Sequence, residues 1–283
     1  MIQCKTIDEI REQVTLLKKQ GKSVAFVPTM GALHQGHLSL IKLAKAHADE
    51  VVVSIYVNPE QFGPNEDFEE YPRQLEDDIQ ACQEEGCSVV FTPDDEIMYG
   101  SDKKYLSIQI NELNLHMDGV SRPGFFEGIL LVVNKLFNIV DPDFAVFGQK
   151  DIQQVQIIRQ MVREFNHNVE IVMAPVQRAE DGLALSSRNA YLTKEQRMVA
   201  PYLYSALKRV EAKIHDGLVE PEAVLKEEQE ELEAKGFKND YLNVFSFSVM
   251  APVEKLEPGN KYILAGAAYL GKTRLIDNLI IDL

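Results

Sequence analysis

Two histidines three positions apart, His34 and His37, are the residues whose types and spacing most clearly indicate chemistry. They follow the apolar run 23–27 and precede an amphipathic stretch, so we expect a loop that leaves a strand and opens a helix. The start of a helix presents backbone N–H groups and the positive end of the helix dipole, which favour a phosphate. Gly31 and Gly36 let the backbone approach closely. With two imidazole donors added, the loop predicts a phosphate-binding site.

A metal site is the alternative for a pair of histidines. Zinc proteases place their two histidines four positions apart with a glutamate between them. The stretch from His34 to His37 has neither feature. A chance pair without function is the other alternative, and the remaining polar clusters argue against it.

Polar residues also follow two further apolar runs. Asn58 and Gln61 come after the run 50–57, and they offer uncharged hydrogen bonds suited to hydroxyls and carboxylates. A strand-ending turn is the alternative for these two residues. Lys150 follows the run 143–147 where a helix is expected to begin, and a cation there opposes the helix dipole unless an anion is bound. Lys150 therefore indicates a phosphate.

The segment 181–189 contains two hydroxyls and a guanidinium, in Ser186, Ser187 and Arg188. Such a loop can close over a triphosphate and neutralise developing charge. Alone, it also fits a loop followed by a helix cap. Its presence downstream of the two histidines favours the functional interpretation.

Four other side chains are candidates with ordinary alternatives. Asp77 and Asp78 could hold a magnesium ion carried by a nucleotide, or simply form a helix surface. Arg122 lies in a turn and could neutralise a substrate carboxylate. Of Gln153 and Gln154, which follow on the same expected helix, we expect one to face the site and the other to be solvated.

Apolar spacing predicts the elements that must position these residues. Thr6 and Glu9 form an expected capping box. The expected helices are 7–17, 38–48, 75–82, 130–140 and 155–165, and the expected strands are 23–27, 50–57, 88–91, 143–147 and 169–173. Strands that alternate with helices predict an α/β fold, a parallel sheet with helices on both faces. Ligands bind at the carboxyl ends of such strands, where the polar clusters would converge.

The pattern changes after about residue 176. Residues 194–235 are charged and helical, and the segments 241–249, 261–270 and 274–282 resemble strands of a small antiparallel sheet. We therefore expect two domains, 1–176 and a smaller α+β domain at 177–283.

The composition limits the possible partners. Of the 283 residues, 45% are hydrophobic and 26% are charged, and the net charge is −15. An acidic surface disfavours nucleic acid and anionic membranes as partners. Three cysteines without metal-like spacing, no signal-peptide pattern near Met1 and no membrane-length apolar run predict a cytoplasmic protein.

Six ordered motifs make the whole chain resemble the pantoate–β-alanine ligases (pantothenate synthetases), within the HIGH-motif nucleotidyltransferase superfamily. These motifs are 27–37, 57–62, 71–73, 121–124, 147–151 and 181–189, and 273–278 near the C-terminus also fits. The resemblance implies a Rossmann-like N-terminal domain, a C-terminal lid and a homodimer. It also implies that ATP, with Mg²⁺, activates pantoate as pantoyl adenylate, which then reacts with β-alanine to give pantothenate and AMP.

The resemblance assigns roles position by position. The residues implied to bind ATP are Met30, Gly31, Ala32, Leu33, His34, Gln35, Gly36, His37, Gly148, Gln149, Lys150, Asp151, Gln177, Leu185, Ser186, Ser187 and Arg188. The residues implied to bind pantoate and β-alanine are Gln61, Gln154, Asn58 and Arg122. His34, His37, Lys150 and Arg188 carry the catalytic roles, with His37 matching the usual proton donor, and Asp77 is the candidate contact for magnesium.

Three positions depart from the family pattern: Glu60, Gln149 and Phe125, where methionine, glutamate and histidine respectively are frequent. Phe125 puts in doubt any role for an imidazole at that position. Another nucleotidyltransferase, which would keep the nucleotide on its product, shares the histidine loop but leaves Gln61 and Gln154 without a task. A regulatory nucleotide-binding module is the third hypothesis.

Overall fold

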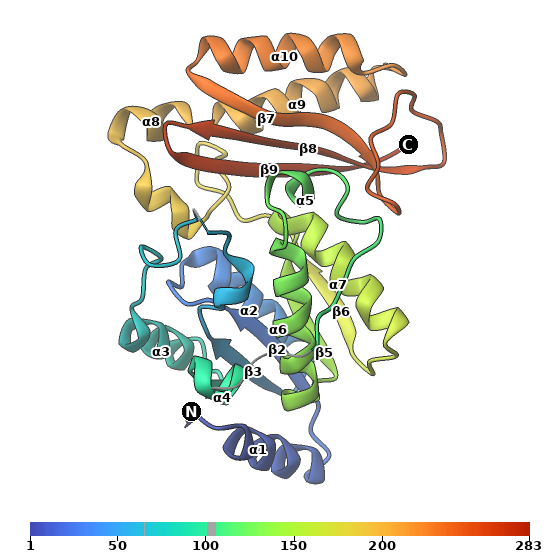
Figure 1. Ribbon diagram of the computed structural model, residues 1–283. Coiled ribbons are helices and arrows are strands. Elements are labelled where there is room, and N and C mark those ends of the chain that lie inside the picture. The colour runs from blue at the N-terminus through green and yellow to red at the C-terminus, as the bar shows by residue number, and fades with distance from the viewer. Residues whose placement is uncertain (65, 101–105) are drawn as a thin grey trace. The chain divides into compact units, whose positions relative to one another are not determined.

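The computed structural model describes residues 1–64, 66–100 and 106–283, which form two compact units (Figure 1). The first unit comprises Met1–Ile110, Arg122–Gln149 and Gln154–Pro175, and the second comprises Asn111–Ser121, Lys150–Gln153 and Val176–Leu283. Two short segments, 111–121 and 150–153, thus belong to the second unit although residues of the first unit flank them along the chain. The division therefore does not follow a single cut along the sequence.

A six-stranded parallel sheet forms the centre of the first unit. Its strand order is β1-β4-β3-β2-β5-β6. The strands are β1 (Ile2–Cys4), β2 (Val24–Thr29), β3 (Glu50–Ile55), β4 (Val89–Phe91), β5 (Phe144–Gly148) and β6 (Glu170–Ala174). The edge strand β1 was not predicted, because three residues are too few to show a pattern.

Helices cover both faces of this sheet. They are α1 (Ile7–Lys19), α2 (Gln35–His47), α3 (Leu75–Glu84), α4 (Asp95–Tyr99), α6 (Phe125–Val140) and α7 (Ile152–Glu164), with short 3₁₀ turns η1 (Pro59–Gln61) and η2 (Gln149–Asp151). Ile41 of α2 and Cys82 of α3 share a core cluster with Ala25 and Val27 of β2. Side chains alternate along a strand, so the fully buried Phe26 faces the opposite side, where α1 and α6 contact each other and β2. The predicted α/β class is confirmed.

The strand register brings three loops to one edge of the sheet. β2 pairs in parallel with β3, Thr29 opposite Ile55, and on its other side with β5, Phe26 opposite Ala145. The carboxyl ends of the three strands are therefore neighbours. Each end leads into a polar cluster that the sequence singled out.

The second unit contains a three-stranded antiparallel sheet in the order β7-β8-β9. Its strands are β7 (Phe237–Ser246), β8 (Lys261–Leu270) and β9 (Thr273–Asp282), and its helices are α5 (Asp118–Ser121), α8 (Lys194–Val199), α9 (Tyr202–His215) and α10 (Glu222–Ala234), with a 3₁₀ turn η3 (Ser187–Tyr191). Leu207 of α9, Leu232 of α10 and Leu264 of β8 belong to one buried cluster. This cluster closes one face of the small sheet.

The predicted bounds of β7, 241–249, are wrong at both ends. The strand starts directly after Gly236, whose φ of +90° turns the chain out of α10. Lys238, Asn239 and Asp240 made its first half resemble a polar loop. They form strand backbone nonetheless, because β8 pairs with this half too.

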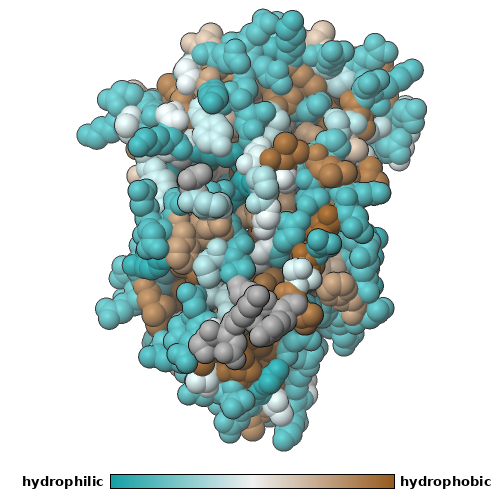
Figure 2. Space-filling model, in the orientation of Figure 1, coloured by the Kyte–Doolittle hydropathy of each residue, from teal (hydrophilic) through white to brown (hydrophobic). Residues whose placement is uncertain are grey.

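The surface carries many polar side chains. Figure 2 shows hydrophilic residues over most of the visible face, with smaller apolar areas between them. In the part of the chain that the structure describes, no helix has both the length and the apolar composition needed to cross a membrane.

Candidate active site

The loop after β2 is fixed by strained backbone and by a carboxylate from α3. Gly31 has a φ of +77°, and Ala32 has a φ of +49°, which alanine rarely adopts. The buried Asp78 accepts the N–H groups of Ala32 and Leu33 at 2.9 and 2.7 Å. A Cβ at Gly31 would lie 2.8 Å from Oδ2 of Asp78, so this position requires glycine. The loop is thus held in one conformation by the protein itself.

His34 and His37 cap the start of α2 reciprocally. Nδ1 of His34 accepts the N–H of Gly36 at 3.0 Å, and Nδ1 of His37 accepts the N–H of His34 at 3.4 Å. Their ring centroids lie 4.2 Å apart. A neutral imidazole whose Nδ1 accepts carries its proton on Nε2. Both rings are therefore set as Nε2–H donors, the form that binds phosphate oxygens.

A second polar cluster follows β3. Nδ2 of the buried Asn58 donates to Oε1 of Gln61 at 3.0 Å and to the carbonyl of Gly128 at 3.2 Å. The hydroxyl of Tyr99 donates to Oδ1 of Asn58 at 2.6 Å. A Cβ at Gly128 would lie 1.9 Å from the carbonyl oxygen of Glu60, so only glycine lets α6 approach this turn. These contacts fix the amide of Gln61 at the carboxyl-end edge of the sheet.

Arg122 is held beside the same turn. Its Nε and Nη2 donate to the two carboxylate oxygens of Glu66, each at 2.6 Å, and Nη2 also donates to the carbonyl of Gln61 at 3.3 Å. The guanidinium carbon lies 3.4 Å from the centre of the Phe125 ring. Phe125 thus stacks on Arg122 and orients it.

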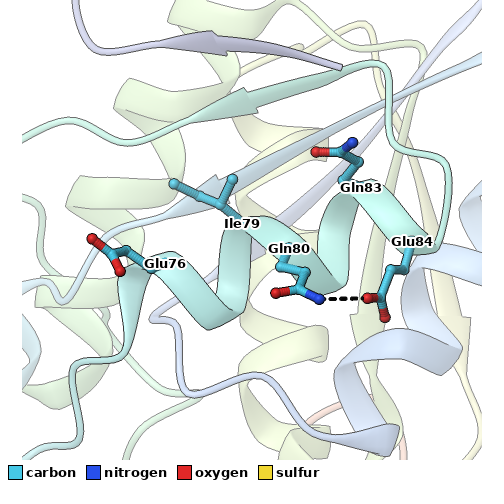
Figure 3. Close-up of a pocket in the computed structure, with 5 residues that line it drawn as sticks. All are labelled: Glu76, Ile79, Gln80, Gln83 and Glu84. Atoms are coloured by element: carbon cyan, nitrogen blue, oxygen red, sulfur yellow. Dashed lines mark hydrogen bonds between the residues drawn. The ribbon is translucent and has the colours of Figure 1, made fainter.

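The two adjacent aspartates of α3 have different environments. Asp78 is buried and bound to the histidine loop, whereas Asp77 is exposed. Near them, an open pocket is lined by side chains of α3 alone, and Gln80 donates to Glu84 there at 2.8 Å (Figure 3). Its lining residues are Glu76, Ile79, Gln80, Gln83 and Glu84. None of them is a predicted site residue, so the pocket is not the candidate site.

In the second unit, a side-chain amide holds Lys150 in place, and the side-chain amide of Gln153 holds Gln153 itself. The side chain of Asn278, on β9, donates to the carbonyl of Lys150 at 3.0 Å. Gln153 donates to the carbonyls of Leu113 and His116, both at 2.8 Å, and accepts the N–H of Asp118. We expected one of Gln153 and Gln154 to be solvated, and Gln153 is not that residue: it is 2% exposed because its amide satisfies three backbone groups.

The loop that carries Ser186, Ser187 and Arg188 also belongs to the second unit. Its base is a short bridge between Arg178 and Ala184, and the carbonyl of Gln177 accepts the N–H of Leu185 at 2.9 Å. The hydroxyl of Ser186 accepts the N–H of Arg188 at 3.3 Å and starts η3. η3 in turn contacts β9.

The structure therefore groups the predicted residues into two sets. The first unit brings 30–37, Asn58, Gln61, Arg122, Gly148 and Gln149 to or beside the carboxyl-end edge of its sheet, and Gln154 lies near the start of α7. The second unit holds Lys150 and Asp151 on one segment, and Gln177 and 185–188 on another. Across the described residues, no group of three or more histidine, cysteine or acidic side chains is arranged to hold a metal ion.

Sequence reasoning missed the residues that hold these groups in place. Asp78 was interpreted as a magnesium ligand or a surface residue. It is spaced as i+3 from Leu75 and i−4 from Cys82, which places it on the apolar side of α3 and could have indicated burial. Glu66 and Tyr99 gave no such signal, because each acts on residues far away along the chain, and Asn278 stood out only as the end of the motif 273–278, without an assigned role.

A family model described as Pantoate-beta-alanine ligase matches residues 2–280 of this chain. A pantothenate synthetase of Carboxydothermus hydrogenoformans is 49% identical over 278 residues, which cover 98% of this chain and 97% of that protein. One from Pseudomonas putida is 47% identical over 280 residues, covering 99% and 97%.

Two solved structures with the same kinds of names are also similar to this chain. A pantothenate synthetase from Thermus thermophilus superposes with a TM-score of 0.90 at 41% identity, and 99% of each chain is covered. A pantoate-beta-alanine ligase from Francisella tularensis, in complex with beta-gamma ATP and beta-alanine, gives a TM-score of 0.81 at 38% identity, covering 99% of this chain and 97% of that one.

Proposed function

Because the chain belongs to the pantoate–β-alanine ligase family, whose members condense pantoate with β-alanine to pantothenate, we propose that it uses ATP in two steps. In the first step, a pantoate carboxylate oxygen attacks the α-phosphorus of ATP, pyrophosphate leaves, and pantoyl adenylate forms. In the second step, the amine of β-alanine attacks the acyl carbon, and AMP leaves. A carboxylate is already ionised at neutral pH, so the first step needs charge neutralisation and positioning rather than a general base.

The observation that carries this proposal is the reciprocal cap formed by His34 and His37. It sets two Nε2–H donors at the start of α2, next to the ends of β2, β3 and β5. Triphosphate oxygens are the ligands that such donors prefer. His37, the nearer of the two to the helix interior, is proposed as the proton donor to the departing pyrophosphate.

The remaining binding roles are divided between ATP and the two other substrates. We propose that ATP is bound by Met30, Gly31, Ala32, Leu33, His34, Gln35, Gly36, His37, Gly148, Gln149, Lys150, Asp151, Gln177, Leu185, Ser186, Ser187 and Arg188. The amides of Asn58, Gln61 and Gln154, with Arg122, are proposed to bind pantoate and β-alanine. The division into a domain 1–176 and a closing domain 177–283 also stays a proposal. Closure would protect the adenylate from water.

The described residues form no preformed protein site for magnesium. Asp78 already accepts two backbone N–H groups, and Asp77 lies on the exposed side of α3. We therefore assign no step to a protein-bound metal. The ion would arrive on the phosphates of ATP, with Asp77 as its one proposed contact. We also propose that the protein is cytoplasmic and forms a homodimer.

A pyrophosphate-release assay tests the proposal directly. With ATP and pantoate alone, we expect a burst of pyrophosphate, and with β-alanine added, continuous release with AMP and pantothenate as products. Mass analysis of the products separates this reaction from nucleotidyl transfer, which would leave the nucleotide on the final product. Formation of ADP, or pyrophosphate release that ignores pantoate, would reject the two-step mechanism.

A further inference from the structure

Two buried polar residues on β9, Asp277 and Asn278, have no role in the reaction described above. Both lie in a strand of the second unit and are 4% and 2% exposed. They are the last two residues of the motif 273–278, to which the resemblance assigned no role. Burying a carboxylate and an amide is unfavourable unless specific partners compensate. Their partners therefore indicate what they do.

Asp277 holds the base of the loop that leads to Arg188. The two Nη atoms of Arg178 donate to its two carboxylate oxygens at 2.5 and 2.8 Å. Arg178 Nη1 also donates to the carbonyl of Gly182 at 3.1 Å, and its guanidinium carbon lies 3.6 Å from the centre of the Tyr204 ring. Burial raises the pKa of the Asp277 carboxyl, and the hydrogen bonds and charge of Arg178 oppose that shift. The ion pair thus fixes the conformation of the 178–184 bridge, from which 185–188 continues.

Asn278 holds Lys150. Its side-chain amide donates to the Lys150 carbonyl at 3.0 Å, across 128 positions of the sequence. The positive charge of Lys150 also acts on the carboxyl of Asp277. Lys150 follows β5 at the start of α7, where the helix dipole disfavours a cation. The contact with Asn278 fixes the backbone from which this side chain extends, while the ammonium lies 3.7 Å from Oδ1 of Asp151.

Neighbouring residues of a strand point to opposite faces, so one dipeptide can hold two separate segments. We propose that Asp277 and Asn278 are positioning residues that fix Lys150 and the loop 178–188 relative to each other. The ammonium of Lys150 and the guanidinium of Arg188 then meet the phosphates of the nucleotide as one preorganised cationic group. The inference rests on the proposed function, because it takes Lys150 and Arg188 as phosphate ligands.

A merely structural role is the competing explanation. A buried amide that satisfies a backbone carbonyl stabilises any fold. Asn239 on β7 provides the matched case, since its amide donates to the carbonyl of Gln229 at 2.8 Å in the same unit. Gln229 has no proposed role in the reaction. Both asparagines therefore stabilise the fold, and only Asn278 would also contribute to ATP binding.

The experiment compares Asn278→Ala with Asn239→Ala by calorimetric titration of the full-length protein with ATP. We expect Asn278→Ala to weaken ATP binding roughly three- to tenfold, the effect of one hydrogen bond. Asn239→Ala should bind ATP as the unchanged protein does, while both variants lose a similar amount of thermal stability. The KM for pantoate should stay unchanged in both.

A double-mutant cycle shows whether Asn278 acts through Lys150. If it does, Asn278→Ala has no further effect on ATP binding in a Lys150→Ala background. An undiminished effect there, or unchanged ATP binding in Asn278→Ala, would overturn the inference and leave the proposed function standing. If Lys150→Ala alone changes neither ATP binding nor rate, the phosphate role of Lys150 fails, and the proposed function must be revised first.

Asp277→Asn tests the part of the proposal that concerns the ion pair between Asp277 and Arg178. It keeps the shape of the side chain and leaves Arg178 without its anion, so we expect weaker ATP binding together with lower stability. ATP binding equal to that of the unchanged protein would exclude Asp277 from the proposal. If this variant does not fold, the Asn278 series decides the inference by itself.

Discussion

The two units hold their candidate residues by different means. In the first unit, β2, β3 and β5 are neighbours in a parallel sheet, and the backbone register alone brings their loops to one edge. In the second unit, buried charges tie together segments that are far apart in the sequence. Arg178 pairs with Asp277 across 99 positions, and Arg274 pairs with Asp118 across 156 positions.

The difference follows from the two sheets. Parallel strands end at a common edge because of their topology, so their loops already lie together, and contacts such as those of Asp78 then fix the loop conformation. A three-stranded antiparallel sheet has no such common edge, and explicit contacts must hold 111–121 and 150–153 to it. Removing one partner of a buried pair leaves a charge without compensation. The second unit should therefore be the more sensitive one to a single change of charge.

Arg274→Met is expected to have the largest effect. Nη2 of Arg274 donates to Asp118 at 2.6 Å and to Asp240 at 2.7 Å, and its side chain is 14% exposed. Without it, Asp118 keeps only the hydroxyl of Tyr241 at 3.2 Å as a side-chain partner among the contacts described here. We expect a loss of about 3–5 kcal/mol in the free energy of unfolding, measured with urea.

Arg197→Met serves as its control. Arg197 also pairs with an aspartate, Asp181, but the two side chains are 38% and 45% exposed. Solvent screens such a pair, so its loss should cost only about 0–1 kcal/mol. Equal losses from the two substitutions would contradict the distinction between buried and exposed pairs in this unit.

His37→Ala and Lys150→Ala test one residue from each unit. Each removes a single charge-stabilising donor, so we expect each rate of pyrophosphate release to fall by about 10²–10³. His47→Ala, at the other end of α2, is the control, because its imidazole is exposed, bonds the carbonyl of Leu43 in its own helix and otherwise lies edge-on to Phe144, away from the predicted site residues. Near-normal turnover in either of the first two variants would remove that residue from the mechanism.

Gly128→Ala tests how closely backbones approach in the first unit. The added Cβ would lie 1.9 Å from the carbonyl oxygen of Glu60, so α6 must move away from the turn that carries Gln61. We expect a loss of up to about 3 kcal/mol in stability and a raised KM for pantoate. At Gly63 the nearest atom would be 3.6 Å away, so Gly63→Ala should change neither quantity.

The local parts of the fold were predictable from the sequence. Thr6 and Glu9 form the expected capping box, and the apolar runs at 50–57 and 143–147 became β3 and β5. The histidine loop followed a strand as expected. In each case the signal lay within a few residues, where spacing and side-chain type decide the structure.

The long-range contacts were not predictable in the same way. Nothing in the sequence near Gln153 shows that its amide satisfies three backbone groups of 113–118. Likewise, the pairing of Arg274 with Asp118 depends on the tertiary fold. Polar residues whose partners are distant look like surface residues in a single sequence, and burial alone distinguishes them.

Asp78→Asn, the change with the smallest expected effect, tests whether the first unit truly avoids dependence on charge. Asp78 is buried like Asp277, but its partners are the N–H groups of Ala32 and Leu33 rather than a guanidinium. An asparagine oxygen can still accept one of them, so we expect a loss of about 1–2 kcal/mol and a modest rise in the KM for ATP. Asp277→Asn leaves a buried cation behind and should cost more. If instead Asp78→Asn proves the more damaging in urea denaturation, then the histidine loop depends on the negative charge itself, and the two units hold their residues by the same means.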